Sequence, residues 1–352
     1  MTTRTLHVIS STNQLLTDLL SLALNANPDN TWQTQVIFDD DAAPQIGTAL
    51  FTSVSGKTYR IELTGTCITC AIRVAMTTFV DSLNTPETFL FLPAGIELAH
   101  LCPGLHNDLA ERHIILGAVM HSIDATNAPA ELLTHMPLSD HGSNLTPDDE
   151  RCLAEIHALN LGYADLILLT GDHDSAGGEL VEHLRAHDTL LANPFEDNIL
   201  AIARLIVHNS QEALERIHPA TIQAWGGPDG HGTWTLDLTS QRAFHPDRLF
   251  DFAEQLGEYG VCARGCFWLA SRPTTICSWD ALGGSVAISS AGSWDTPADA
   301  QTHIVIVGIG DNTTRDAISR AFSQALATDE DMLFAEADDG LDQWLGTNVI
   351  EG

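Results

Sequence analysis

Short apolar runs alternate with segments of helical pattern over about the first 220 residues of this 352-residue chain. Largely apolar runs at residues 5–9, 89–92, 114–120 and 166–169 have the length of buried strands. Amphipathic segments between them predict helices, including one over residues 71–83. Apolar strands separated by helices are typical of a parallel sheet covered on both faces. We therefore predict an α/β fold for this part of the chain.

Two further helices can be predicted in more detail. Asn13 is suited to cap a helix whose apolar residues share one face and should be buried: Leu15, Leu16, Leu19, Leu20, Ala23 and Leu24. Residues 146–150 read Thr-Pro-Asp-Asp-Glu, which combines a cap, a proline at the first position and acids in the first turn. This pattern predicts a helix that begins there and runs to about Leu161.

The composition changes after residue 224. Residues 225–232 are rich in glycine and predict a linker. The following segments predict strands at 234–238, 263–270, 276–279, 285–289 and 303–307, and helices at 246–256 and 316–326. This pattern indicates a smaller α+β domain with helices on one face of a mostly antiparallel sheet. We predict domains at 1–224 and 233–352, joined by the linker 225–232.

The charge of the chain restricts its partners. Fifteen basic residues against 47 acidic ones give a net charge of −32. Direct binding to nucleic acid needs cations against phosphates, so we expect none, and an anionic membrane surface is disfavoured for the same reason. Contact with a basic protein surface is permitted. The simplest explanation of the charge is solubility, or adaptation to high salt.

Membrane insertion and secretion are not expected. No apolar run reaches 18 residues, and residues 1–4 lack the pattern of a signal peptide. Seven cysteines at irregular spacings suit reduced thiols better than a disulfide framework. We therefore expect a cytoplasmic protein.

The single lysine, Lys57, lies in Gly56-Lys57-Thr58 between two strand-like runs, 49–54 and 59–63. We interpret it as part of a hairpin turn, because Phe51 stands where a phosphate-binding loop has its leading glycine. After the first strand, residues 10–14 read Ser-Ser-Thr-Asn-Gln, without glycine or lysine. We expect a connection too short to wrap phosphates.

Cys67 and Cys70 are the residues with the clearest chemical potential. Two thiols two residues apart at a strand-to-helix junction can converge on one metal, and helix amides favour thiolate. Zinc is the metal that such a pair most commonly selects. A redox pair, or two small side chains without a role, are alternatives. Cys262 and Cys266 flank a predicted strand, and we interpret them as core or surface residues rather than as a clamp.

Sixteen histidines are scattered along the chain, without His-x-His or Glu-x-x-His spacing. His231 in the linker is free to bind metal, although a lone histidine is usually just exposed. His100 and Cys102 follow the predicted strand at 89–92. They are candidates for further ligands beside Cys67 and Cys70.

Several segments together resemble the CobW-type GTPases, a metal-handling family. Residues 65–73 resemble its Gly-Cys-x-Cys-Cys-x-Leu-Arg motif, and residues 163–169 its Phe-Ala-Asp-hydrophobic strand. Residues 263–273 resemble the C-terminal Arg-x-Lys-Gly-hydrophobic-hydrophobic-Trp-Leu-Ala segment, which is the most specific match. The resemblance implies a P-loop-NTPase-like sheet with helices on both faces, followed by a CobW C-terminal domain.

The chain departs from the family at each nucleotide-binding element. The phosphate loop is absent, and Leu92 takes the place of the glutamate that organises magnesium. The guanine-reading Asn-Lys-x-Asp aligns with residues 170–173, where His173 replaces the aspartate. Thr69 replaces the middle cysteine, so three thiolates become two, which weakens zinc binding and favours transfer or sensing over storage. The resemblance therefore implies zinc as a ligand and makes GTP an unlikely one.

The same departures are similar to those of one actinobacterial branch of the family, which also has a Phe-His-Pro-x-Arg-Leu segment, here residues 244–249. That branch is linked to zinc scarcity and recruits a hibernation factor to ribosomes. The resemblance implies a non-catalytic adaptor with a basic protein partner, such as a ribosomal protein or the hibernation factor. The alternative is a GTP-dependent zinc metallochaperone with an unusual nucleotide site.

Overall fold

The computed structural model describes residues 3–24, 26–38, 45–258, 260–333 and 339–346. The strands are β1 (Arg4–Ser10), β2 (Thr31–Ile37), β3 (Gln45–Ser53), β4 (Thr58–Thr64), β5 (Glu87–Phe91), β6 (Ile114–Asp124), β7 (Leu166–Thr170), β8 (Leu190–Ala192), β9 (Thr233–Ser240), β10 (Cys262–Leu269), β11 (Arg272–Leu282), β12 (Ser285–Ser293) and β13 (Thr302–Ile309). The helices are α1 (Gln14–Ala23), α2 (Ile68–Ser82), α3 (Leu98–Ala110), α4 (Ala128–Leu133), α5 (Leu153–Tyr163), α6 (Ala176–Leu184), α7 (Ile199–Ala203), α8 (Ser210–Ile217), α9 (Pro246–Glu258), α10 (Asn312–Ala325), α11 (Asp329–Leu333) and α12 (Asp342–Leu345), with 3-10 turns at Leu138–His141 and Pro297–Asp299.

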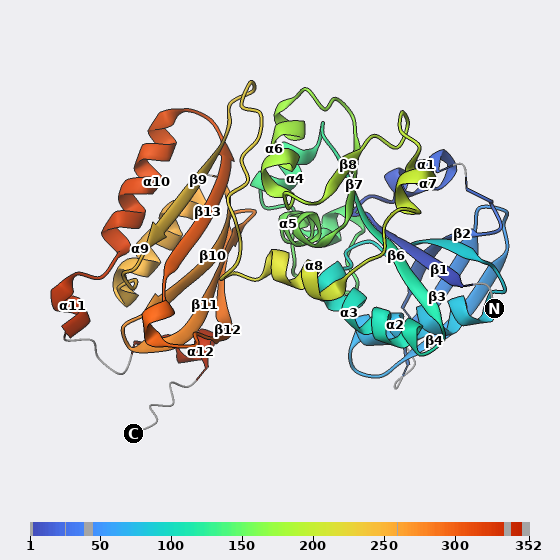
Figure 1. The fold of residues 1–352 in the computed structure, drawn as a ribbon, viewed down its shortest axis with the longest axis horizontal. Helices are drawn as coiled ribbons and strands as arrows, with labels where there is room; N and C mark the ends of the chain where they lie inside the picture. The colour runs from blue at the N-terminus through green and yellow to red at the C-terminus, as the bar shows by residue number, and fades with distance from the viewer. Residues whose placement is uncertain (1–2, 25, 39–44, 259, 334–338, 347–352) are drawn as a thin grey trace. The chain divides into compact units, whose positions relative to one another are not determined.

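The first sheet has the strand order β4-β3-β2-β5-β1-β6-β7-β8. Strands β2, β5, β1, β6, β7 and β8 are parallel to their neighbours in this series, whereas β3 and β4 add an antiparallel edge (Figure 1). Met120 on β6 faces the cluster that α1 and α7 cover, and the next residue, His121, points to α5 on the opposite face. Helices therefore cover both faces, and the predicted mostly parallel α/β fold is confirmed.

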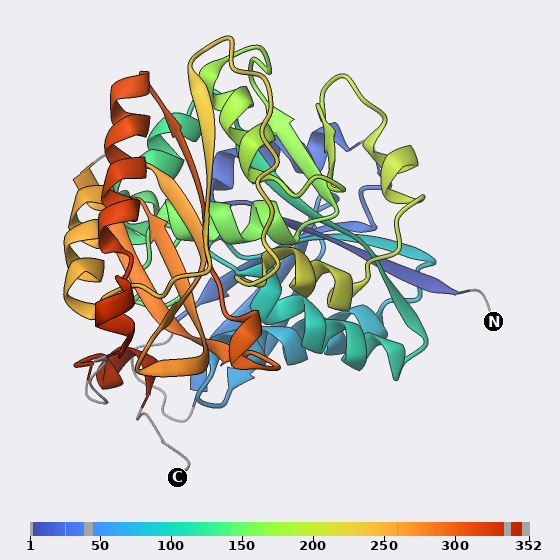
Figure 2. The same cartoon turned by 60° about the vertical axis from the view of Figure 1, so that its left-hand side comes forward.

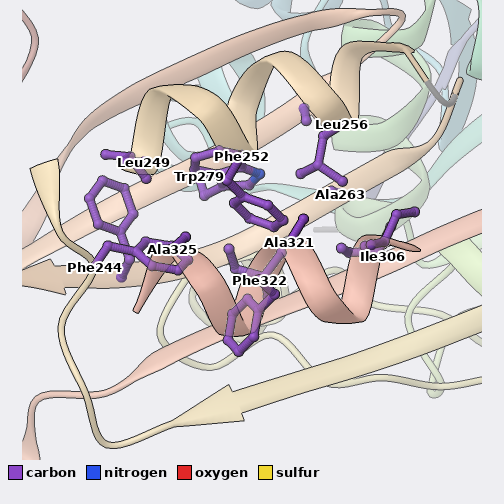
Figure 3. Close-up of a cluster of buried hydrophobic side chains, with 14 of the residues drawn as sticks. Phe244, Leu249, Phe252, Leu256, Ala263, Trp279, Ile306, Ala321, Phe322 and Ala325 are labelled. Atoms are coloured by element: carbon purple, nitrogen blue, oxygen red, sulfur yellow. The ribbon is translucent and has the colours of Figure 1, made fainter. Parts of the chain in front are cut away.

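The second sheet has the order β12-β11-β10-β13-β9, and every pairing in it is antiparallel. Helices α9 and α10 lie side by side over one face, as Figures 1 and 2 both show. Their inward residues meet the sheet in an aromatic core (Figure 3). Trp279 stacks on Phe252 with ring centroids 5.3 Å apart, and Phe244 and Phe322 make edge contact at 5.6 Å. The predicted antiparallel C-terminal domain is confirmed.

Packing divides the chain into two units that are not continuous in sequence. One contains residues 1–127, 136–173 and 185–214, and the other contains 128–135, 174–184 and 215–352. Helix α6 thus joins the second unit, where it packs against β9 and β13. The domain bounds 1–224 and 233–352 stay a prediction.

The predicted helix start at residues 146–150 is wrong. Helix α5 begins at Leu153, where Glu155 accepts a hydrogen bond from the Cys152 amide at 2.7 Å and completes a capping box. The upstream acid Asp149 instead accepts from the Leu145 amide at 3.0 Å and pairs with Arg151. Residues 146–150 therefore lie in a loop and do not start a helix. The residues that follow this loop, Arg151 to Leu153, instead pair with the segment from Met136 to Leu138.

Two other differences concern helices on the first sheet. In α1 the expected buried face is only partly buried, because Leu20 and Leu24 lie in the core while Leu15 and Leu19 are exposed. Helix α3 was not predicted. It carries Pro103 in its sixth position, beyond the first turn, where a proline has no amide to donate to the carbonyl four residues earlier, so the local sequence disfavours a helix there.

The interpretation of Lys57 is confirmed. Strands β3 and β4 pair as an antiparallel hairpin, and Gly56 occupies its turn with a φ of 88°, which favours glycine. Lys57 forms an exposed ion pair with Asp29 at 3.1 Å. Among the residues that the structure describes, no helix combines the length and the apolar character needed to cross a bilayer.

Candidate functional site

The connection between β1 and α1 consists of three residues, 11–13. Asn13 caps α1 by accepting from the Leu16 amide at 3.1 Å, so the helix begins immediately after the strand, as predicted. Ser11 and Thr12 are buried. Open α/β sheets bind ligands at the carboxyl ends of their parallel strands. The length of this connection and the burial of its side chains therefore decide what a site here can hold.

Two histidines from other elements contact the hydroxyls of Ser10, at the end of β1, and of Thr12 in this connection. Ser10 Oγ lies 2.7 Å from His121 Nδ1, His121 Nε2 lies 2.9 Å from His157 Nδ1, and His157 Nε2 lies 3.0 Å from Thr12 Oγ1. Asn160 binds the Ile96 carbonyl at 2.9 Å. All of these side chains are buried, so we name Ser10, Thr12, His121 and His157 the histidine chain. Burial, and then the neighbouring His157, lower the pKa of His121 well below its usual value.

A further loop packs directly on the connection. The buried Ser143 hydroxyl donates to the Thr12 carbonyl. A Cβ added to Gly95 would lie 2.2 Å from the Ser143 carbonyl oxygen, and Gly95 has a φ of 76°. Only glycine therefore permits this close approach. The loop that carries Ser143 thus occupies the space beside Thr12.

The other positions implied by the family resemblance are engaged by backbone or side-chain partners. Leu92 is buried, and its amide donates to the Ile9 carbonyl at 2.8 Å. His173 is exposed, with Nε2 3.0 Å from the Leu169 carbonyl oxygen. Thr170 donates to Asp124 at 2.7 Å. These side chains satisfy one another or the backbone.

Cys67 and Cys70 lie at the start of α2, and both are exposed. Cys67 occupies the N-cap position, and its sulfur accepts from the Cys70 amide at 3.4 Å. This backbone hydrogen bond, with the Cys70 thiol next in importance, lowers the pKa of Cys67. The hydrogen bond between the two side chains, burial and the Cys67 charge raise the pKa of Cys70. The first thiol is therefore the more readily ionised.

His100 is the predicted additional ligand that lies near this pair. It is exposed, and a hydrogen bond to Glu97, together with a smaller contribution from the Cys67 charge, raises its pKa. Glu97 in turn pairs with Arg151 at 2.7 Å. A carboxylate on one imidazole nitrogen orients the other towards a metal in many metal sites.

Cys102 does not belong to this group. It is completely buried in α3, and burial raises the pKa of its thiol far above the usual value. Its prediction as a ligand is therefore wrong, since an exposed pair cannot share a metal with a core thiol. Within the described residues, no three histidine, cysteine or acidic side chains are arranged to hold a metal ion.

The remaining candidate ligands are engaged in packing or in hydrogen bonds within the protein. Cys262 and Cys266 are both buried in β10, which agrees with their interpretation as core residues. His231 binds the buried Glu179, whose Oε1 accepts from the His231 amide at 2.9 Å and lies 3.2 Å from its Nδ1. It therefore anchors the segment before β9 to α6.

Comparison with known proteins identifies the C-terminal part. Residues 233–326 match the cobalamin synthesis protein cobW C-terminal domain. This match covers β9 to α10, so the second sheet and the two helices that cover it resemble that domain.

The relatives that match a larger part of the chain are distant in sequence. The chain is 22% identical over 250 residues to a protein of Mycobacterium tuberculosis named zinc chaperone Rv0106, and equally to the uncharacterized protein Mb0109 of Mycobacterium bovis. The match covers 66% of this chain and 60% of each relative's own length. Solved structures of the zinc-bound YjiA GTPase of E. coli and of a zinc-bound triple mutant of YjiA are 13% and 14% identical, with TM-scores of 0.37 and 0.39. They cover 92% of this chain and 99% of their own, and a likeness of this size indicates neither substrate nor mechanism.

Sequence reasoning did not find the histidine chain. His121 lies on β6 and His157 on α5, 36 residues apart, so no local spacing connects them. The one available signal was a histidine inside each of two largely apolar segments, 114–123 and 153–163. A buried histidine needs a polar partner, but only the tertiary fold supplies its identity.

Proposed function

We propose that this chain is a zinc-linked adaptor of the CobW family, which acts in the cytoplasm through protein contacts and not by hydrolysing a nucleotide. The observation that carries the proposal is the closed connection after β1. Its hydroxyls are engaged by His121 and His157, and Ser143 packs against its backbone. Phosphoryl transfer depends on positioned amides and cations around the phosphates. Here the place for both is occupied by the protein itself.

Zinc is the metal that fits the exposed donors. Cys67 and Cys70 supply soft sulfur ligands, one of them with a lowered pKa, and His100 adds a nearby imidazole whose other nitrogen is held by Glu97. Zinc commonly takes four ligands, and the described residues do not bring a third histidine, cysteine or acidic side chain into position beside the two thiols, so the site is an open one. An open site exchanges metal readily. The relative named as a zinc chaperone supports this assignment.

Replacing Cys67 by serine is expected to weaken zinc binding by more than about 100-fold, since even an outer-shell partner is worth about 10- to 100-fold. The measurement is a competition titration against a chromophoric chelator. Thr69→Cys should instead tighten binding by adding a third thiolate, with Thr69→Ser as its matched control. Unchanged affinity in Cys67→Ser would show that zinc, if bound, is held elsewhere.

The partner is a basic protein, because the net charge of −32 favours cationic surfaces and opposes direct contact with nucleic acid. We propose that zinc limitation leads this adaptor to bring a hibernation factor to the ribosome. Support comes from the resemblance to the corresponding branch of the family.

An affinity-tagged chain expressed in zinc-starved cells is expected to retain ribosomal proteins or the hibernation factor, and to lose them when zinc is restored. The measurement is mass spectrometry of the captured proteins, with a zinc-replete culture as control. Capture that excludes every ribosome-associated protein would argue against this adaptor role while leaving the zinc site intact.

The opposed pKa shifts of Cys67 and Cys70 favour a second candidate, a dithiol redox pair. Oxidation would join the two sulfurs and pass two electrons and two protons to glutathione disulfide, which becomes two glutathione molecules. Equilibration in glutathione buffers with thiol counting distinguishes the candidates. A redox function requires the pair to interconvert reversibly with a disulfide within the range of cellular potentials, whereas a zinc site keeps both thiols reduced and protected by metal.

A further inference from the structure

Helix α1 carries leucines on its outer face as well as on its buried face. Leu20 and Leu24 lie in the core, together with the buried polar residues Thr17 and Ser21. On the outer face, Leu15, Leu19 and Leu22 are exposed by 67%, 48% and 66%. Apolar side chains that gather on an exposed surface often mark a protein interaction site. The outer face of α1 is therefore suited to contact another molecule.

The three exposed leucines, which we name the leucine stripe, are spaced by four and three residues. Residues at this spacing follow one another along one side of a helix, so they form a continuous row. Similar rows bind the apolar face of a second helix in helix-in-groove recognition. The stripe therefore presents a shape that a partner helix can match.

Acidic side chains lie in and near this region. Asp18 is exposed within the stripe, and Glu196 and Asp197 are exposed just before α7, which packs on the same core cluster as α1. The cation that follows α7, Arg204, is neutralised by Glu87 at 2.7 Å and 2.9 Å. The surroundings are thus apolar with a negative rim.

We propose that the leucine stripe docks an amphipathic helix of a partner protein, with leucine-like residues against the stripe and lysine or arginine on its flanks. A second copy is disfavoured, because two chains of charge −32 repel each other. An anionic membrane is disfavoured for the same reason. The inference rests on the adaptor part of the proposed function and is independent of the zinc site.

The test uses the full chain and a fluorescein-labelled 18-residue peptide of leucine and lysine, with leucines at helical spacing. A shuffled peptide of the same composition controls for simple charge attraction. Fluorescence anisotropy near physiological salt should show binding of the patterned peptide that is at least about 10-fold tighter than that of the shuffled one. The triple variant Leu15→Gln, Leu19→Gln, Leu22→Gln should abolish this difference.

The matched control is Leu333→Gln, which changes an exposed leucine on α11 and should leave binding unchanged. Because the stripe is exposed, the triple variant should keep the parent's thermal transition by circular dichroism. Equal binding of both peptides, or of parent and triple variant, would overturn the proposal. A parent dimer in sedimentation that the triple variant disrupts would overturn it in favour of a second copy.

The same variant separates this inference from the proposed function. If the triple variant still captures ribosomal partners from zinc-starved cells, the adaptor role holds and the stripe is not its surface. If the patterned peptide binds through the stripe but no ribosomal protein is captured, docking holds and the assigned partner is wrong.

Discussion

Replacement of Arg272 by alanine is expected to lower the free energy of unfolding of the C-terminal unit by about 3 to 5 kcal/mol. The Arg272 and Asp339 side chains are only 2% and 1% exposed, and they pair through two contacts of 2.7 Å and 2.9 Å. Arg272 also donates to the Gly346 carbonyl at 2.6 Å. Its removal leaves a buried carboxylate without its main partner and releases the segment that carries Asp339 and Gly346.

Chemical denaturation monitored by tryptophan fluorescence measures this loss. The matched control is Arg242→Ala, which breaks an exposed pair with Asp329 at 3.0 Å and should cost no more than about 1 kcal/mol. A similar small loss in both variants would mean that the buried pair contributes little. That outcome would contradict the role assigned to Arg272 in holding the C-terminal segment.

The replacement of His157 by alanine is expected to cost about 3 to 5 kcal/mol in the N-terminal unit. It leaves Thr12 Oγ1 and His121 Nε2 without their partner in the histidine chain, at about 1 to 3 kcal/mol for each unsatisfied group. It also leaves a cavity beneath the connection after β1, which adds to the cost. Denaturant unfolding is the appropriate measurement. The exposed His173→Ala serves as control and should change stability by less than about 0.5 kcal/mol.

The pH dependence of the free energy of unfolding provides a second test of the histidine chain. Burial lowers the pKa of His121 in the folded state, so the unfolded state binds more protons below the usual value of 6.5. The stability of the fold that depends on a neutral His121 is therefore complete above pH 6.5 and is lost as the pH falls below that value. A parent protein whose stability is flat from pH 7 to 5 would contradict a neutral, buried histidine chain.

Much of the fold follows from local pattern. The runs at residues 89–92 and 166–169 are apolar throughout, which is possible only for strands buried on both faces. The hairpin around Gly56 follows equally from alternation and turn chemistry. In these places the local preference and the tertiary packing agree, and the sequence-based prediction is confirmed.

The differences arise where tertiary contacts override local preference. Thr146 to Glu150 resembles a helix start, yet Asp149 serves a loop whose ends pair with the Met136 segment. The same loop carries Ser143 onto Thr12. The closure of the candidate nucleotide site therefore depends on contacts 131 residues apart, which no local pattern reveals. The cysteine pair could be predicted, because its chemistry needs only two residues in one helical turn.

We propose that the protein functions without holding a nucleoside triphosphate after β1, where Thr12 is bound by His157 and covered by Ser143. Isothermal titration of the full chain with GTP and magnesium tests it most directly. The account predicts no binding heat, with or without zinc. Saturable binding at micromolar GTP, weakened by Thr12→Val, would contradict it and establish the GTP-dependent zinc chaperone instead.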